Sequence, residues 1–388
     1  MEELILGELT ERKIGYGIVQ PGESTIGGIP VIKVNNIISG LKSIQDLDTT
    51  HPENDQKYRK TRLNGGEIII SVVGTIGKTA IVPMNFKGCN LVRATALIDI
   101  KDPILSRWVK YYIDSPKGQS YINGNLNTTV QPTLNIKSLV EMPIPFYGRE
   151  YAEKVVTILS KIDDKIENNR KINDNLEQQA QAAFNNIIAH YSECETINLS
   201  EIAVLNPKRT IAKGTLARSI EMAQLPTSGS FPAGWDMKEY NGGMKFQNGD
   251  TLMARITPCL ENGKVAYINF LEENEVAFGS TEYIVIASKG AIAPEVFYFL
   301  TRHNDFVDFA VKNMNGSSGR QRVSAETIGT YKLPVISPED LVILETIAKE
   351  ALNKIKYNSL ENIRLSEIRD TLLPKLMSGQ LKINEIDC

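Results

Sequence analysis

Three short segments of this chain contain residue types that enzymes use, but none has the spacing that the chemistry needs. Asn206-Pro207-Lys208-Arg209 begins like the catalytic tetrapeptide of an adenine methyltransferase, yet it lacks the second proline and the aromatic ring that would hold an extruded base. Two residues separate Gly74 from Gly77, whereas a loop that cradles phosphate needs four. Glu261 and Lys264 resemble part of a nuclease site, but their spacing is wrong and a turn explains them. We therefore expect no catalytic residue in this chain.

The histidines and cysteines also fail to form a recognisable site. His51, His190 and His303 stand in unrelated contexts, which supports neither a metal cluster nor a catalytic triad. The four cysteines lie far apart and include no CxxC pair, so buried or incidental thiols in a reducing cytoplasm are expected. No glycine-rich turn suits a methyl donor or a dinucleotide. We expect this chain to bind no metal and no cofactor.

Clustered basic and polar side chains predict a different chemistry, contact with nucleic acid. The formal net charge of −3 excludes a protein that is basic throughout. Residues 57–62 nevertheless hold four cations beside a tyrosine, which suits phosphate; a solvated strand edge is the alternative. Residues 123–132 and 315–322 are rich in hydrogen-bond donors, which suits phosphates and base edges; plain surface loops are the alternative. The candidate contacts are Lys57, Arg59, Lys60, Arg62, Asn127, Thr128, Gln131, Lys208, Arg209, Arg255, Lys264, Arg320, Gln321 and Arg322.

The elements that must position these side chains occur twice. Asn64-Gly65-Gly66-Glu67 opens a strand–turn–strand pattern, and Asn248-Gly249-Asp250 opens another. The proline-rich segment 142–145 recurs at 333–336, and each copy leads into a long helical segment. This period is almost half the chain, far longer than the roughly 20–50 residues of a solenoid repeat. The sequence therefore predicts a duplicated domain with a duplicated helix, suited to a partner with two similar ends.

Each copy is expected to be a mixed α/β domain with short strands between glycine, asparagine and proline turns. An amphipathic helix follows the strands at 104–114 and again at 294–302, and its aromatic residues are expected to pack in the core. The predicted strands are 67–73, 79–82, 94–100, 250–256, 264–268 and 283–287.

Two long helices are predicted at 150–187 and from Pro338 to 373, the first free of proline and glycine. Apolar residues recur at steps of three and four, the seam of a coiled coil, and asparagines interrupt the seam at matching places. Each helix would be about 45–55 Å long at about 1.5 Å per residue. We expect the helices to pair and the asparagine layers to fix their register; two separate core helices are the alternative. Pro374 should kink or end the second helix. The predicted pairing residues are Ile158, Ile162, Ile166, Asn169, Asn173, Leu176, Ile347, Ala351, Ile355, Asn358, Asn362 and Leu365.

The predicted fold class is α/β (α+β), with two similar mixed α/β domains and two long, antiparallel, paired helices. The domains are expected at 1–149 and 189–337, the helices at 150–188 and 338–388. The first residues lack the basic segment and apolar run of a secretory signal, and no stretch approaches the roughly 18 apolar residues of a membrane span. A cytoplasmic protein without membrane contact is expected.

Four segments of the sequence resemble one family. Ile162–Phe184 and Leu372–Leu381 in the helices, with Gly249–Ala266 and Phe278–Ile286 in the second domain, look like the specificity subunit of type I restriction-modification systems. The resemblance covers essentially the whole chain.

The resemblance implies two target-recognition domains that each read one half of a bipartite DNA site, held apart by spacer helices. It also implies a non-catalytic subunit that recruits two modification subunits, which methylate adenine with S-adenosylmethionine. For the larger assembly, the resemblance implies two restriction subunits that use ATP and Mg. Because the two polar loops differ, we expect an asymmetric target in double-stranded DNA.

Two other hypotheses remain open. An interaction scaffold would dimerise through the long helices and read no DNA itself. A stand-alone enzyme would be a fusion of two similar domains, but the missing cofactor motifs argue against it.

Overall fold

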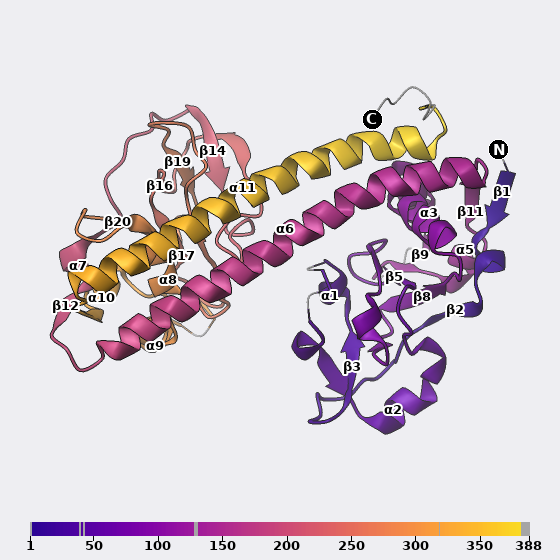
Figure 1. Cartoon of the computed structure of the whole chain (residues 1–388), viewed down its shortest axis with the longest axis horizontal. Coiled ribbons are helices and arrows are strands. Elements are labelled where there is room, and N and C mark those ends of the chain that lie inside the picture. Colours follow the sequence, from indigo (N-terminus) through magenta and orange to yellow (C-terminus); the bar gives the residue numbers. More distant parts are fainter. Residues whose placement is uncertain (1, 39, 42, 128–130, 318, 382–388) are drawn as a thin grey trace. The chain divides into compact units, whose positions relative to one another are not determined.

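The computed structural model of this chain describes residues 2–38, 40–41, 43–127, 131–317 and 319–381. The described residues fall into two compact units, one within Met1–Asp164 and Leu365–Cys388 and the other within Lys165–Arg364. Each unit combines short strands with helices and contains part of two long helices, α6 (Arg149–His190) and α11 (Pro338–Met377) (Figure 1). The predicted fold class is confirmed.

The first unit is built on an antiparallel sheet in the order β2-β8-β5-β6. A second sheet, β4-β3-β7, mixes one antiparallel and one parallel pair, while β1 pairs with β11 and β9 with β10. The strands are β1 (Glu2–Ile5), β2 (Arg12–Tyr16), β3 (Ile29–Ile32), β4 (Asp48–Thr50), β5 (Ile68–Ser71), β6 (Thr79–Ile81), β7 (Asn90–Leu91), β8 (Thr95–Asp99), β9 (Leu126–Asn127), β10 (Thr133–Leu134) and β11 (Pro143–Phe146). The helices are η1 (Leu6–Leu9), α1 (Val34–Ile38), η2 (Ile44–Asp46), α2 (Pro52–Lys57), η3 (Arg59–Thr61), η4 (Met84–Phe86), α3 (Pro103–Asp114), α4 (Pro116–Gly124) and α5 (Ile136–Val140).

The second unit repeats this plan. Its antiparallel sheet has the order β13-β20-β17-β18, its mixed sheet the order β15-β14-β19-β16, and β12 pairs with β21. The strands are β12 (Thr196–Asn198), β13 (Ala203–Leu205), β14 (Leu216–Ile220), β15 (Asp236–Glu239), β16 (Met244–Phe246), β17 (Thr251–Ala254), β18 (Val265–Tyr267), β19 (Ala277–Gly279), β20 (Tyr283–Ser288) and β21 (Lys332–Pro334). The helices are α7 (Leu199–Ile202), α8 (Pro294–Thr301), α9 (Asn304–Lys312) and α10 (Ala325–Gly329).

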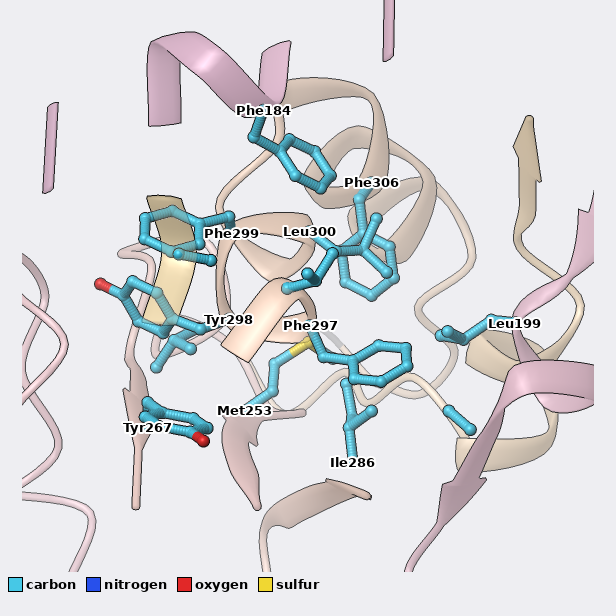
Figure 2. Close-up of a cluster of buried hydrophobic side chains, with 14 of the residues drawn as sticks. Phe184, Leu199, Met253, Tyr267, Ile286, Phe297, Tyr298, Phe299, Leu300 and Phe306 are labelled. Atoms are coloured by element: carbon cyan, nitrogen blue, oxygen red, sulfur yellow. The ribbon is translucent and has the colours of Figure 1, made fainter. Parts of the chain in front are cut away.

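The six predicted strands agree with β5, β6, β8, β17, β18 and β20 to within two residues at each end. The strands β5 and β17 are buried at every position, which explains their unbroken apolar character. The predicted packing of the aromatic residues is also confirmed. Trp108 is fully buried on α3 and donates its indole N–H to the carbonyl of Pro145 at 2.9 Å. On α8, Phe297, Tyr298 and Phe299 lie in the core of the second unit (Figure 2).

Within the second unit, α6 and α11 run antiparallel and contact each other through asparagines. Asn169 donates to Asn362 at 2.9 Å, and Asn358 donates to Asn173 at 2.8 Å. Asn169 and Asn358 are 1% and 3% exposed. Each amide therefore has a partner in a place where water is excluded, and a shift of either helix would break both layers.

Apolar side chains flank these layers. Ile166, Ala351 and Ile355 are buried, while the remaining apolar residues of the predicted seam are partly buried. The partly buried residues are Ile158, Ile162, Leu176, Ile347 and Leu365.

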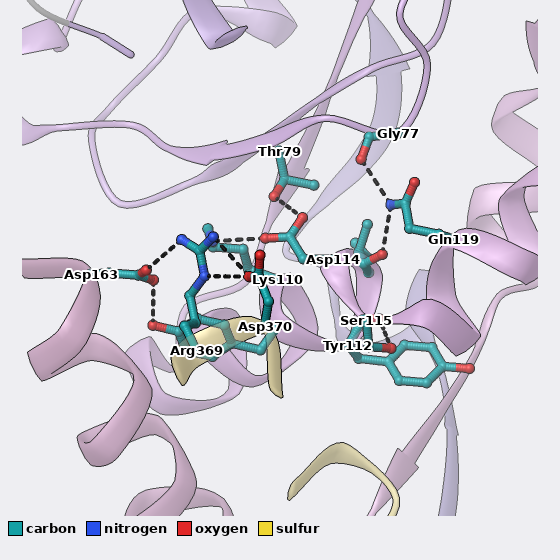
Figure 3. A network of polar contacts seen from close by, with 12 residues as sticks. Gly77, Thr79, Lys110, Tyr112, Asp114, Ser115, Gln119, Asp163, Arg369 and Asp370 are labelled. Atoms are coloured by element: carbon teal, nitrogen blue, oxygen red, sulfur yellow. Dashed lines mark hydrogen bonds and ion pairs between the residues drawn. The ribbon is translucent and has the colours of Figure 1, made fainter. Parts of the chain in front are cut away.

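Within the first unit, an ion pair joins the same two helices to each other, and a hydrogen bond joins α6 to α3. Asp163 on α6 accepts from the Tyr111 hydroxyl at 2.9 Å and pairs with Arg369 of α11 at 3.1 Å. Lys110 pairs with Asp114 at 2.8 Å, and Asp114 also accepts from the Thr79 hydroxyl on β6 (Figure 3). Burial and the Asp163 carboxylate raise the pKa of Tyr111, so its hydroxyl stays a donor. This network fixes the helices against the sheet.

Of the two effects predicted for Pro374, an end to the second helix is wrong. Pro374 lies inside α11, which continues to Met377. The carbonyl that loses its helical donor belongs to Asp370, whose position is exposed, so water can replace the missing hydrogen bond. Leu376 and Met377 are buried in the core of the first unit, and this burial stabilises the last turn of α11. The helix ends at Met377, and Gly379, two residues later, has a φ of 69°.

Candidate nucleic-acid interface

The basic cluster of the first unit, residues 57–62, forms the end of α2 and the short helix η3 rather than a strand edge. We call it the basic turn. Lys57, Arg59 and Lys60 are exposed on it, which suits contact with phosphate. Arg62 instead forms an ion pair with Asp55, a carboxylate that is 1% exposed, and this hydrogen bond raises the pKa of Arg62. Arg62 therefore holds the turn together.

Arg12 on β2 anchors the basic turn to the sheet. Its guanidinium donates to the carbonyls of Lys60 at 3.3 Å and Arg62 at 2.7 Å. The same group pairs with Glu67 and with Asp99, each at 2.5 Å. The backbone that carries the exposed cations is thus fixed by charge-assisted hydrogen bonds.

A related ion pair lies inside the second unit. Arg209 pairs with Asp250, and their side chains are 11% and 2% exposed. Asp250 also accepts from the backbone N–H of Gln247 at 2.8 Å. Because Asp250 directly precedes β17 as Glu67 precedes β5, the two carboxylates have equivalent places in the repeat. Arg209 is used within the fold, whereas the neighbouring Lys208 is exposed.

In the polar segment of the first unit, the strands β9 and β10 pair, and we call residues 126–127 and 131–134 the first hairpin. Asn127 lies opposite Thr133, and Thr133 also forms a bridge with Val73, just beyond β5. Asn127 and Gln131 are exposed. Thr128 lies outside the described residues. The hairpin is therefore attached at its base to the end of the central strand.

The polar segment of the second unit has the same construction, and we call residues 315–317 and 319–323 the second hairpin. Asn315 and Arg322 exchange both backbone hydrogen bonds at 2.9 Å, and Arg322 also bridges to Ile256, just beyond β17. The N–H of Thr257 donates to the carbonyl of Gln321 at 3.0 Å. Arg320 is exposed, and Gln321 is partly exposed.

Two arginines converge on one carboxylate at the base of the second hairpin. Arg322 donates to Glu282 through Nη2 at 2.7 Å and through Nε at 2.9 and 3.0 Å. Arg255 donates to the same carboxylate through Nε at 3.2 Å. Hydrogen bonds from Arg322 are the main reason that the pKa of Glu282 lies below its usual value. We call these three residues the arginine cluster; its net charge is positive.

Lys264 lies elsewhere in the unit. Its ammonium group donates to the carbonyl of Met222 at 2.6 Å. It therefore holds the turn between β17 and β18 against a neighbouring loop.

The two hairpins stand on equivalent backbone frames that carry different side chains. The N–H of Val72 donates to the carbonyl of Ala94 at 2.8 Å, and the N–H of Arg255 donates to that of Glu282 at 3.0 Å. The N–H of Leu134 then donates to the carbonyl of Val72 at 2.9 Å. In the same way, the N–H of Val323 donates to the carbonyl of Arg255 at 3.0 Å. The positions of Arg255, Glu282 and Arg322 are thus occupied in the first unit by Val72, Ala94 and Thr133.

The sequence indicated the cations of these surfaces but not their partners. Glu282 and Arg12 were not identified as candidates, although each fixes a candidate segment. A weak signal existed for Glu282, which directly precedes a predicted strand. For Arg12, the contacts with positions 60, 62, 67 and 99 depend on tertiary structure.

Two features of the described residues concern other kinds of site. No group of three or more His, Cys, Asp and Glu side chains within this part of the chain could hold a metal ion. None of the helices described is both long and apolar enough to cross a membrane.

Known proteins that are similar in sequence to this chain include specificity subunits of type I restriction enzymes. Residues 3–178 match the family described as type I restriction modification DNA specificity domain. The EcoBI specificity subunit of Escherichia coli is 29% identical over 157 residues, which are 40% of this chain and 33% of that protein. The HindI specificity subunit of Haemophilus influenzae is 22% identical over 328 residues, covering 64% of this chain and 71% of that one.

A similar fold occurs in a solved structure. The S subunit of a type I restriction-modification system from M. genitalium has a TM-score of 0.54 and 17% identity, with 97% of this chain and 95% of that chain covered. At this identity the likeness concerns the fold.

Proposed function

We propose that the whole chain is the non-catalytic specificity subunit of a type I restriction-modification system, because residues 3–178 match the DNA specificity domain of such systems. The resemblance seen in the sequence is confirmed by the matched family and by its relatives. The chain spans only a third of the EcoBI subunit, so its activity as a whole is our proposal.

The proposed target is a bipartite, asymmetric site in double-stranded DNA, with one unit for each half. The observation that carries this proposal is the repeated backbone frame with unlike side chains. The frame of the first unit, at Val72, Ala94 and Thr133, carries one hydroxyl group. The frame of the second unit carries the two guanidinium groups and the carboxylate of the arginine cluster. Since base edges are distinguished by the donors and acceptors presented to them, hairpins held on such different frames should prefer different bases.

The basic turn is proposed to contact phosphates in the first unit's half-site. Lys57, Arg59 and Lys60 are exposed on a backbone fixed by Arg12. Phosphate contacts orient a protein on the duplex but carry no sequence information. The first hairpin, with Asn127 and Gln131 exposed, is the proposed reader of bases in that half.

The proposed partners are two modification subunits, which would methylate adenine with S-adenosylmethionine, and two restriction subunits, which would use ATP and Mg. The specificity subunit would dock these enzymes and supply the sequence preference. This division of labour agrees with the lack of a recognisable catalytic motif in the sequence.

The decisive experiment is to co-express the chain with its neighbouring modification subunit and map DNA methylation across the genome at single-base resolution. We expect methyladenine in both halves of a split motif. A stable complex that methylates nothing would overturn the proposal and favour an interaction scaffold. Methylation by the chain alone would contradict its non-catalytic role.

A further inference from the structure

The second hairpin presents one arginine from a backbone that is fixed on several sides. The N–H of Arg320 donates to the carbonyl of Ser317 at 3.0 Å, and its own carbonyl accepts from Nη1 of Arg322 at 3.0 Å. The following carbonyl, that of Gln321, accepts from both the N–H and the hydroxyl of Thr257. The exposed side chain of Arg320 is therefore attached to a backbone that hydrogen bonds hold in place.

The guanidinium group of Arg322 is already hydrogen-bonded within the protein. Its Nε and Nη2 bind Glu282, and its Nη1 binds the Arg320 carbonyl, so three of its nitrogens serve the hairpin. The Glu282 carboxylate receives two guanidinium groups and can hold the planar Arg322 fork in one orientation. Arg322 is thus a support for the hairpin, while Arg320 is the side chain left to meet a ligand.

An arginine presented in this way suits one base. The guanidinium fork matches O6 and N7 of guanine in the major groove, and a fixed backbone loses less entropy on binding than a mobile one. In the first unit, the position equivalent to Arg322 is occupied by Thr133, whose side chain has no guanidinium group. The chemistry is therefore specific to one half of the proposed site.

On the basis of the proposed function, we infer that Arg320 contacts guanine in the second unit's half-site and that Glu282 is a positioning residue acting through Arg322. Glu282 touches no DNA in this arrangement. Its effect on sequence preference passes through the Arg322 fork and the carbonyl of Arg320.

The test selects binding sites from a random duplex library with the complete chain in complex with its modification subunit. Wild type should select a split motif with a strong guanine preference in one half. Arg320→Ala should remove that preference at a single position and lower affinity for the selected site by about 5- to 150-fold. Lys312→Ala, which removes another exposed cation from this unit, is the matched control and should leave the motif unchanged.

Two further variants test the positioning role. Glu282→Gln removes the charged partner of Arg322, and Arg322→Lys removes the fork. Both should weaken the same guanine preference while the rest of the motif stays. Because Glu282→Gln also removes a negative charge, its binding to unrelated DNA should stay equal or rise, which a general loss of structure would not produce. Thermal melting is recorded for each variant, and Glu273→Gln, at another exposed carboxylate, is the control.

The outcomes separate the two levels of the argument. A wild-type motif that Arg320→Ala leaves unchanged would overturn this inference alone. Loss of guanine preference in Arg320→Ala without any change in Glu282→Gln and Arg322→Lys would overturn the positioning role. The absence of any wild-type motif would overturn the proposed function, and the inference with it.

Discussion

Asn358 on α11 donates a hydrogen bond of 2.8 Å to Asn173 on α6, at a position where its side chain is only 3% exposed. A second layer, from Asn169 to Asn362, lies about one turn away. Such layers cost stability compared with apolar packing but allow one register of the helices. They make the helix pair of the second unit a defined structure rather than a sliding one.

A double substitution should separate the stability of these layers from their specificity. Asn358→Leu alone leaves the Asn173 carbonyl without this partner and should lower the free energy of unfolding by about 1–3 kcal/mol. Asn173→Leu with Asn358→Leu should recover the loss or exceed wild type. Urea unfolding measures both, with Asn186→Ala as an exposed control on α6. Equal losses from the single and double variants would contradict an asparagine layer.

The layer at Asn169 should also respond to pH. Hydrogen bonds from Asn169 at 2.7 Å, and then from Lys165, lower the pKa of Glu361. Since this pKa is lower in the folded chain than in the unfolded chain, the stabilisation is complete above the unfolded value, about 4.3. It is lost as the pH falls through the folded value.

Melting temperatures from pH 3 to 7 check this. Glu361→Gln should melt below wild type at pH 7, and the difference should shrink towards pH 3. Glu350→Gln, at an exposed position of α11, is the control. A difference that does not depend on pH would count against the charged hydrogen bond.

Neighbouring cations in the second unit should behave differently. Arg209→Ala leaves the buried Asp250 carboxylate without its ion pair and should destabilise the unit by about 3–5 kcal/mol. Lys208→Ala removes an exposed cation and should change stability by less than about 0.5 kcal/mol. Chemical denaturation of both variants makes the comparison. Similar losses from the two would show that the position of the charge does not matter.

The basic turn should supply affinity without sequence preference. Arg59→Ala with Lys60→Ala should weaken binding to all duplexes and reduce the slope of log K against log salt by about 1.8, if each contacts one phosphate. Lys154→Ala, at an exposed lysine that pairs with Glu150 on α6, is the control. Binding titrations between low and moderate salt give the slope. A changed motif with an unchanged slope would assign these residues to base reading instead.

Periodicity and residue type determined much of this architecture. The long helices follow from apolar steps of three and four without an internal breaker, and α6 extends the predicted range by only a few residues. The central strands were predictable because β5 and β17 are buried on both faces and therefore read as unbroken apolar runs. The matching asparagines in the two helices predicted the polar layers for the same reason: local spacing fixes which side chains share a helix face.

Other elements were beyond local pattern. The strands of the mixed sheets, such as β7 with two residues, are too short to show a period and exist because neighbouring strands complete their hydrogen bonds. Pro374 was expected to kink or end α11; the helix does not end there, because burial of the residues after it outweighed the lost hydrogen bond.

The candidate sites show the same division most clearly. The sequence alone identified cations in residues 57–62 and 320–322, since charge and exposure tend to go together. It could not distinguish Arg209 from Lys208, or Arg322 from Arg320. That distinction depends on whether a carboxylate from elsewhere in the chain, Asp250 or Glu282, reaches the guanidinium. Ion pairs between distant residues form only once the backbone has brought them together, so tertiary structure alone decides which cations support the fold and which remain exposed.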